Sequence, residues 1–313
     1  MSPEHAKKAV AALEKKIQAL RMVLEQQQIR GSRDIEKAFE EKKQQEKQQK
    51  LQAILLQKNL TIAERLQKGA RIDTDRDGLS DAEEFLLQTD PDRSDTDHDG
   101  YSDFSEVEFG FPPLKRETAK IYSDISSAGK SLAAISRFAL MGLFPEKEDT
   151  FNPSTKATKA EFVGLLMEVF ANMKDFSYQK LPFSDVSSDD WFAPAVRAAF
   201  SLNVISGDEK YFRPLEYVSR LEACSLVLSA SGTPPISFLK NEKIPFEDIS
   251  FSDVATAITC SEKNILDIEE PEQVASTEDV PESEKILPSF EPQKEVTRAE
   301  MALMIYRAIF VAE

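Results

Sequence analysis

Two short acidic segments carry residues whose types and spacing suit a hard cation. The first offers oxygen ligands at loop positions 1, 3, 5, 7, 9 and 12, from Asp73, Asp75, Asp77, Leu79, Asp81 and Glu84. The second repeats the pattern D-x-D-x-D-G-x5-E 22 residues later, from Asp95, Asp97, Asp99, Tyr101, Asp103 and Glu106. Calcium takes six to eight oxygens, position 7 supplies a backbone carbonyl, and glycine at position 6 permits the sharp turn. The sequence therefore predicts about two bound Ca²⁺ ions.

An acidic, solvated loop without metal is the alternative interpretation of these segments. The tandem pair is complete at every ligand position, and this favours calcium. Each loop gathers five carboxylates, whose mutual repulsion opposes the fold when no cation is present. We therefore expect the block to be ordered by calcium and loose without it. His98, at loop position 4, is expected to be exposed and not a ligand.

The connection between the two loops is too short for a pair of ordinary EF-hands. Only ten residues separate Glu84 from Asp95, and they include Thr89-Asp90-Pro91, which cannot continue a helix. The segment 71–112 resembles thrombospondin type-3 repeats and their bacterial relatives. The resemblance implies a calcium-stiffened spacer outside the cytoplasm, where sites with a Kd of about 10⁻⁴–10⁻³ M suffice.

A second pattern recurs three times between residues 120 and 313. Each copy has an aromatic-x-Asp segment and then Phe-x-Pro, as in Tyr122-Ser-Asp124 with Phe151-Asn-Pro153, Phe183-Ser-Asp185 with Phe212-Arg-Pro214, and Phe246-Glu-Asp248 with Phe290-Glu-Pro292. The opening aromatic residue precedes the proline by 31 residues in the first two copies and by 46 in the third. We assign the extra residues to a loop within 267–284, which is rich in Glu, Pro and Ser.

Five residues after each proline comes Ser/Thr-x-x-Glu, which is a capping box at the start of a helix. An apolar helix is predicted after each box, at 162–169, 223–228 and 301–309. A shorter helix is predicted before each Phe-x-Pro turn, at 131–141, 192–202 and about 251–263. One repeat is too small to bury a core of its own, so we expect the three to pack their capped helices together in a pseudo-threefold arrangement.

These repeats resemble three tandem S-layer homology (SLH) domains, at about 120–175, 181–232 and 244–311 within the segment 115–313. The second copy carries the resemblance best, in FSDV, DDWFAPAV, LNVISGD, YFRP and VSRLEA. The resemblance implies a non-catalytic module that anchors a protein to the bacterial cell wall by binding an anionic envelope polysaccharide in grooves between repeats. Lys159, Arg220 and Arg298 fall at the first helical position, where a cation and free backbone N–H groups suit a carboxylate ligand.

The three grooves are expected to be unequal. The first copy has Lys130 where the second has Trp191, and Glu146 where it has Gly207. The third copy lacks counterparts of both Trp191 and the Gly207-Asp208 pair. We therefore expect the groove built around Trp191, Gly207, Asp208 and Arg220 to bind ligand, and at least one other to be inactive.

Structural explanations exist for the same residues. The capping box accounts for its Ser/Thr and Glu without a ligand, and the adjacent cations could be solvated surface charges. Trp191 could be a core anchor or a platform for sugar stacking. The repeated aspartates, Asp124, Asp185 and Asp248, are expected to cap the short helix or a turn and not to touch ligand.

The first 70 residues predict a helical stalk. A coiled-coil seam is formed by Val10, Leu13, Ile17, Leu20 and Leu24. We expect one broken helix or two helices, at 4–30 and 33–68. Self-association through this part is one expectation, and a solvated or hairpinned helix is the alternative. The coiled-coil interpretation is limited because the segment contains fewer than four clean heptads.

Composition limits the function classes. The formal charge is −16, of which residues 71–110 supply −11, so an acidic body argues against nucleic acid as a partner. No apolar run is long enough to span a membrane, and no secretory signal opens this chain. We expect a fragment of a longer extracellular, cell-wall protein. The two cysteines, Cys224 and Cys260, are interpreted as buried apolar residues.

The expected fold class is mainly α: an N-terminal long helix or coiled coil, EF-hand-like calcium loops, and a pseudo-threefold three-repeat helical module. The expected function is surface anchoring. A structural scaffold with ligand-free repeats is the alternative. An enzyme is not expected, because the chain has two histidines and no nucleophile or phosphate-binding motif.

Overall fold

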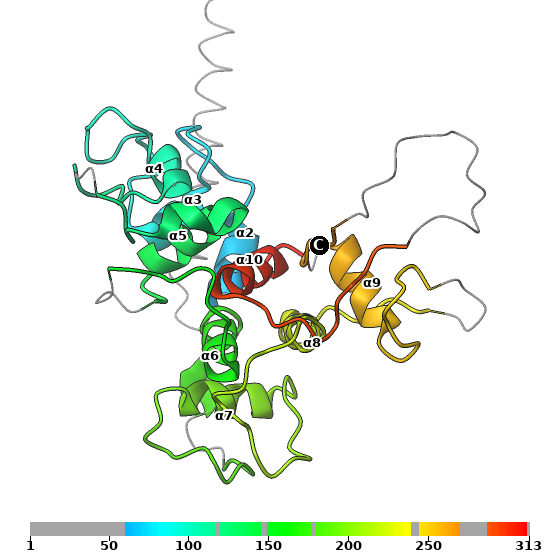
Figure 1. The fold of residues 1–313 in the computed structure, drawn as a ribbon. Helices are drawn as coiled ribbons and strands as arrows, with labels where there is room; N and C mark the ends of the chain where they lie inside the picture. The colour runs from blue at the N-terminus through cyan, green and yellow to red at the C-terminus, as the bar shows by residue number, and fades with distance from the viewer. Residues whose placement is uncertain are drawn as a thin grey trace, which may run out of the picture. The chain divides into compact units, whose positions relative to one another are not determined.

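The computed structural model describes residues 60–116, 119–144, 149–176, 180–238, 244–269 and 287–311 (Figure 1). The chain divides into two compact units after Leu56, and the account below concerns the unit Gln57–Glu313. The predicted coiled coil, its self-association and most of the predicted insertion lie outside the described residues. Among those described, helices dominate, and extended backbone pairs only in isolated bridges. No helix in this part of the chain is long and apolar enough to cross a membrane.

Three capped helices form the centre of the repeat module: α6 (Lys159–Phe170), α8 (Arg220–Ser231) and α10 (Arg298–Ala308). Thr158, Ser219 and Thr297 are their N-caps, and each hydroxyl accepts the N–H of the glutamate three residues on. The reciprocal bond, in which the N–H of the cap residue donates to the glutamate carboxylate, completes the box in the first and third repeats. The predicted capping boxes are therefore confirmed, with a half-formed one in the second repeat.

The shorter helices of the repeats are α5 (Leu132–Leu140), α7 (Ala193–Ser201) and α9 (Val254–Glu262). Two 3₁₀ segments accompany them, η1 (Ile125–Ser131) and η2 (Met173–Phe176). Each capped helix packs on the short helix of another repeat: α6 on α7, α8 on α9, and α10 on α5 (Figure 1). The last pairing brings the third repeat back to the first.

A closed set of backbone hydrogen bonds joins the segments that precede the capped helices. The Ala157 N–H donates to Val296 O (2.9 Å), Val296 N–H to Val218 O (2.9 Å), and Val218 N–H to Ala157 O (3.1 Å). All three residues have no exposed surface. We propose on these contacts that the repeats are related by a pseudo-threefold axis.

Each Phe-x-Pro turn is held by the aspartate that opens its repeat. Asp185 accepts the N–H groups of Phe212 and Arg213 at 2.8 and 2.7 Å, and Asp124 and Asp248 hold their own turns in the same way. The middle residue of each turn has positive φ, for example 59° at Arg213, a conformation that non-glycine residues adopt at a cost. The aspartates offset this cost, so the prediction that they hold a turn is confirmed.

The block of two acidic loops, residues 71–112, and the helix before it pack against this module. The block contains α3 (Asp81–Leu87) and α4 (Asp103–Phe109), and α2 (Ile62–Gly69) precedes it. Thr61 caps α2, whose Leu66 joins the core of the repeats, and the Gln67 side-chain amide donates to Ile309 O. Residues 62–69 thus form a separate helix that belongs to the unit Gln57–Glu313. The domain boundary predicted at residue 70 therefore lies within this compact unit.

Candidate functional site

The two acidic loops fold around their carboxylates in the same way. Asp73 accepts the N–H groups of Arg76 (2.6 Å) and Gly78 (3.2 Å), and Asp95 accepts those of His98 (2.8 Å) and Gly100 (3.0 Å). The glycines have φ of 115° and 102°, which confirms the turn predicted at position 6. His98 is exposed, as predicted.

The carboxylate oxygens converge as a cation site requires. One oxygen from each of Asp73, Asp75 and Asp77 lies within 4.8 Å of the others, and the second loop groups Asp95, Asp97 and Asp99 in the same way. Several buried carboxylate oxygens have no hydrogen-bond partner: Asp75 Oδ2, Asp97 Oδ2, both oxygens of Glu84 and Oε2 of Glu106. Buried, unpartnered carboxylates are costly unless they bind a cation, so these residues fit calcium.

Proton affinity in the metal-free loops follows from this crowding. Burial, together with the charges of Asp75 and Asp77, raises the pKa of Glu84 to about 9. Burial and the charges of Asp97 and Asp99 raise that of Glu106 to about 8. Each glutamate would therefore hold a proton at neutral pH until a cation displaces it.

The aspartates at loop position 9, which are predicted ligands, also form hydrogen bonds within their own loops. Both oxygens of Asp81 accept bonds from Thr74, from its N–H and its hydroxyl, each at 2.8 Å. Asp103 holds Thr96 in the same way, at 3.0 and 2.7 Å. Threonine at position 2 of each loop is thus a partner that the sequence analysis missed. The two aspartates hold their loops through it, and their role as ligands stays a prediction. The pattern T at position 2 with D at position 9 was the signal.

The residue at loop position 7 also packs in a core, but only in the first loop. The Leu79 side chain is fully buried with Leu87 and Val107 in a small core under the loops, whereas the Tyr101 side chain is 67% exposed. Asp77 links the loops, because its Oδ2 accepts the N–H of Phe104 at the start of α4 (2.8 Å).

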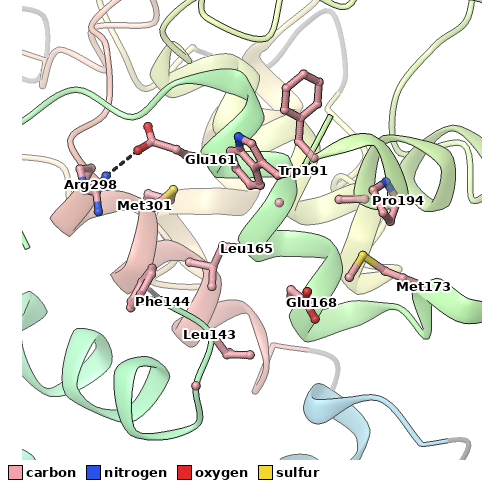
Figure 2. Close-up of a pocket in the computed structure, with 14 residues that line it drawn as sticks. Leu143, Phe144, Glu161, Leu165, Glu168, Met173, Trp191, Pro194, Arg298 and Met301 are labelled. Carbon is pink, nitrogen blue, oxygen red and sulfur yellow. Dashed lines mark hydrogen bonds and ion pairs between the residues drawn. The ribbon is translucent and has the colours of Figure 1, made fainter. Parts of the chain in front are cut away.

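A groove of about 640 Å³ lies where the three repeats meet, and Figure 2 shows its lining. The groove is lined by the residues after α5, by α6, and by the starts of α7 and α10. Its residues are Gly142, Leu143, Phe144, Glu161, Gly164, Leu165, Glu168, Met173, Trp191, Phe192, Pro194, Ala195, Arg298 and Met301.

The indole of Trp191 lies against α6 at a glycine. A Cβ placed on Gly164 would meet Trp191 Cζ3 at 3.1 Å, so the ring needs this glycine for its close approach. Phe192 supports the ring edge-on at 5.5 Å, and Trp191 remains 67% exposed. The indole is therefore an exposed platform and not a core anchor. The corresponding positions of α8 and α10 are Ser225 and Leu303, so a glycine inside an apolar helix was the signal for this site.

The three cations at the first helical position are all paired, each with a glutamate of another repeat's capping box. Lys159 Nζ lies 2.8 Å from Glu222 Oε1, Arg298 Nη1 lies 2.5 Å from Glu161 Oε1, and Arg220 Nη2 lies 3.7 Å from Glu300 Oε1. The pairs run from the first repeat to the second, the second to the third, and the third to the first. Arg220 is 5% exposed, because Glu291 and the carbonyl of Phe290 also hold it.

The groove predicted around Trp191, Gly207, Asp208 and Arg220 does not form as a unit. Trp191 shares its groove with Arg298, whereas Arg220 is buried against Glu291. Gly207 packs tightly against the Phe200 ring, and Asp208 bonds only to the neighbouring Ser206 hydroxyl among the interactions described. Each capped helix places its cation against the next repeat and not against its own. The sequence pattern of a single repeat could not reveal this pairing.

A smaller groove of about 210 Å³ holds Lys159 together with Ser206, Glu209 and Glu222. Between the third and first repeats, Lys130 occupies the place of Trp191 and pairs with Asp267 at 2.5 Å. Arg307 joins the same carboxylate at 2.9 Å. The three inter-repeat positions therefore differ in their side chains.

The sequence of the second repeat matches a known family. Residues 182–224 match the S-layer homology domain. The matched segment runs from the opening of the repeat through Trp191 and the turn to the first half of α8. An SLH domain indicates attachment to the cell wall. The first and third repeats and the thrombospondin-like loops remain predictions.

Three enzymes are similar to parts of this chain. The exoglucanase XynX of Acetivibrio thermocellus is 31% identical over 161 residues, and the amylopullulanase of Thermoanaerobacterium thermosulfurigenes is 30% identical over 161 residues. Each match covers 50% of this chain. Endo-1,4-beta-xylanase A of Thermoanaerobacterium saccharolyticum is 38% identical over 72 residues, 23% of this chain. The chain spans only 13%, 8% and 6% of those proteins, so their activities are not carried over.

Proposed function

We propose that this chain is a non-catalytic module that holds a protein on the bacterial surface by binding a cell-wall polysaccharide. The observation that carries the proposal is a groove lined by both an exposed Trp191 and Arg298 (Figure 2). An aromatic platform next to a charged group suits a sugar ring that carries a polar or anionic substituent.

The groove would bind its ligand through a few residues in defined roles. The sugar face stacks on the indole, while Leu143, Phe144 and Met301 exclude water from the floor. Arg298 is already aligned by Glu161 and lies 4.9 Å from the centre of the Phe151 ring, so its orientation is fixed before the ligand arrives. An anionic substituent would share the guanidinium with Glu161.

The test is a pull-down of the full chain with purified cell-wall sacculi. Trp191→Ala should weaken binding to the sacculi at least tenfold, which corresponds to a loss of about 1.4 kcal/mol of binding free energy. Leu215→Ala is the matched control, because Leu215 is 81% exposed and lies outside the described grooves. Undiminished binding by Trp191→Ala would refute the assignment of this groove.

We further propose that the two acidic loops each bind Ca²⁺. The converging aspartates and the buried, unpartnered oxygens of Glu84 and Glu106 support this. The metal would supply charge neutralisation and tie the loop to its following helix. Calorimetry in millimolar calcium should report about two sites, and Asp77→Ala combined with Asp99→Ala should abolish both.

One observation favours a second function, that of a scaffold with ligand-free repeats. Every cation at the start of a capped helix is paired with a glutamate, and these pairs account for the cations without a ligand. Absence of sacculus binding by the intact, folded chain would favour this alternative.

A further inference from the structure

The calcium block is built into the wall-binding module through one buried arginine. Arg137 of α5 is 5% exposed and reaches both exit helices of the block. Its Nε lies 2.8 Å from Glu83 of α3, and its Nη1 lies 2.8 Å from Glu108 of α4. Tyr306 of α10 donates its hydroxyl to the same Glu83 oxygen at 3.2 Å, and the guanidinium lies 5.4 Å from the Tyr306 ring centre.

Apolar contacts join the same elements. Leu140 and Met141, at the end of α5, pack against the small core of Leu79, Leu87 and Val107 beneath the loops. Figure 1 shows α3 and α4 beside α5, which agrees with the contact between α4 and α5. The block therefore touches the first repeat through a charged centre and an apolar patch.

The chain segment that makes this contact continues into the lining of the groove. Gly142, Leu143 and Phe144 follow Met141 in the chain and line the groove. A row of aromatic rings makes a second connection: Tyr306 to Phe138 (6.0 Å), Phe138 to Phe144 (6.4 Å) and Phe144 to Phe151 (5.0 Å). Phe151 is the ring on which Arg298 lies.

The positions of the two glutamates tie this network to the loops. Glu83 precedes the proposed ligand Glu84 in α3, and Glu108 follows Glu106 by two residues in α4. Both helices have seven residues, too few to be stable alone. When the loops lack a cation, repulsion among their carboxylates opposes the fold that presents both glutamates to Arg137.

We propose that calcium in the two loops controls the groove, because it fixes Glu83 and Glu108 on Arg137 and thereby sets the segment 142–144 and Arg298. The acidic block is then a metal-dependent part of the binding module and not only a spacer. This inference rests on the proposed wall-binding function and on calcium binding by the loops.

Trp191 makes the coupling measurable without any wall polymer. It is the only tryptophan of the chain and it lines the groove, so its fluorescence reports the state of the groove. Adding about 10 mM calcium to the EDTA-treated full chain should shift its emission. Sacculus binding should rise at least fivefold, the lower end for coupled sites.

Arg137→Met should separate the two parts. Calorimetry should still report calcium binding, while the Trp191 response and the calcium dependence of sacculus binding disappear. Arg213→Met is the control, because that guanidinium pairs only with the exposed Glu209 and Glu216 of the second repeat among the contacts described. If circular dichroism shows that Arg137→Met is unfolded, Glu108→Gln replaces it, since Glu108 is the less buried partner.

Two results would overturn the coupling: unchanged Trp191 emission while calorimetry shows filled calcium sites, or no calcium binding at all. A Trp191 response without any sacculus binding would instead refute the wall-binding function and leave the coupling intact. A calcium response retained in Arg137→Met and Glu108→Gln would refute the role of the arginine.

Discussion

Glu84→Gln should have opposite effects on stability with and without calcium. Glu84 has no exposed surface and neither carboxylate oxygen has a partner. Its pKa is about 9 in the metal-free fold against a usual value of 4.5, so folding without metal takes up a proton at pH 7. The stability that this proton contributes is complete below pH 4.5 and is lost as the pH rises towards 9. An amide needs no proton, so the variant should be more stable than the parent in EDTA at pH 8.

Calcium reverses the order. A site with a Kd of about 10⁻⁴–10⁻³ M, filled at about 10 mM calcium, stabilises the fold by about 1.4–2.7 kcal/mol. Glu84→Gln removes the bidentate ligand and should lose this gain at the first loop, while Glu106 keeps it at the second.

The assay is urea unfolding at pH 6 and pH 8, each in EDTA and in calcium. Glu209→Gln serves as a control for loss of an exposed carboxylate in the second repeat. The reasoning is refuted if the variant keeps the full calcium gain, or if it is less stable than the parent in EDTA at both pH values.

Three further predictions concern the repeats. Gly164→Ala should leave the fold intact by circular dichroism but weaken sacculus binding severalfold, because the new methyl group displaces the indole; equal binding would show that its position is unimportant. Asp185→Ala should lower the free energy of unfolding by about 2–4 kcal/mol, since two backbone N–H groups lose a charged acceptor, and urea unfolding measures this. Cys224 and Cys260 should resist alkylation in the native protein, because both are buried and burial raises the pKa of the Cys260 thiol; rapid labelling without denaturant would contradict the packing of α8 on α9.

Local features of this fold followed from the sequence because they depend on neighbouring residues. The capping boxes at Thr158 and Thr297 need only a hydroxyl and a glutamate three residues apart. The turns at Gly78 and Gly100 need only a residue that tolerates positive φ. The short helices at 132–140, 193–201 and 254–262 were predicted from their place before each Phe-x-Pro turn, and each lies within three residues of its predicted bounds.

Relations between repeats could not be predicted in this way. Arg298 and Glu161 are 137 residues apart, and nothing in a capping box indicates which repeat its cation will contact. The predicted groove therefore combined Trp191 with Arg220, a residue that the fold buries elsewhere. Arg137 was missed for the same reason, because its partners Glu83 and Glu108 lie in a segment that the sequence presented as a separate spacer.

The ring of backbone bonds through Ala157, Val218 and Val296 has a consequence for biosynthesis. Val296 follows Ala157 by 139 residues, so a growing polypeptide cannot close the ring until the start of the third repeat's capped helix has been synthesised. The first repeat must wait, still open, for the last. A product truncated before α10 would lack the buried side chains of that helix and leave the surfaces of α5, α6 and α8 that pack on it uncovered.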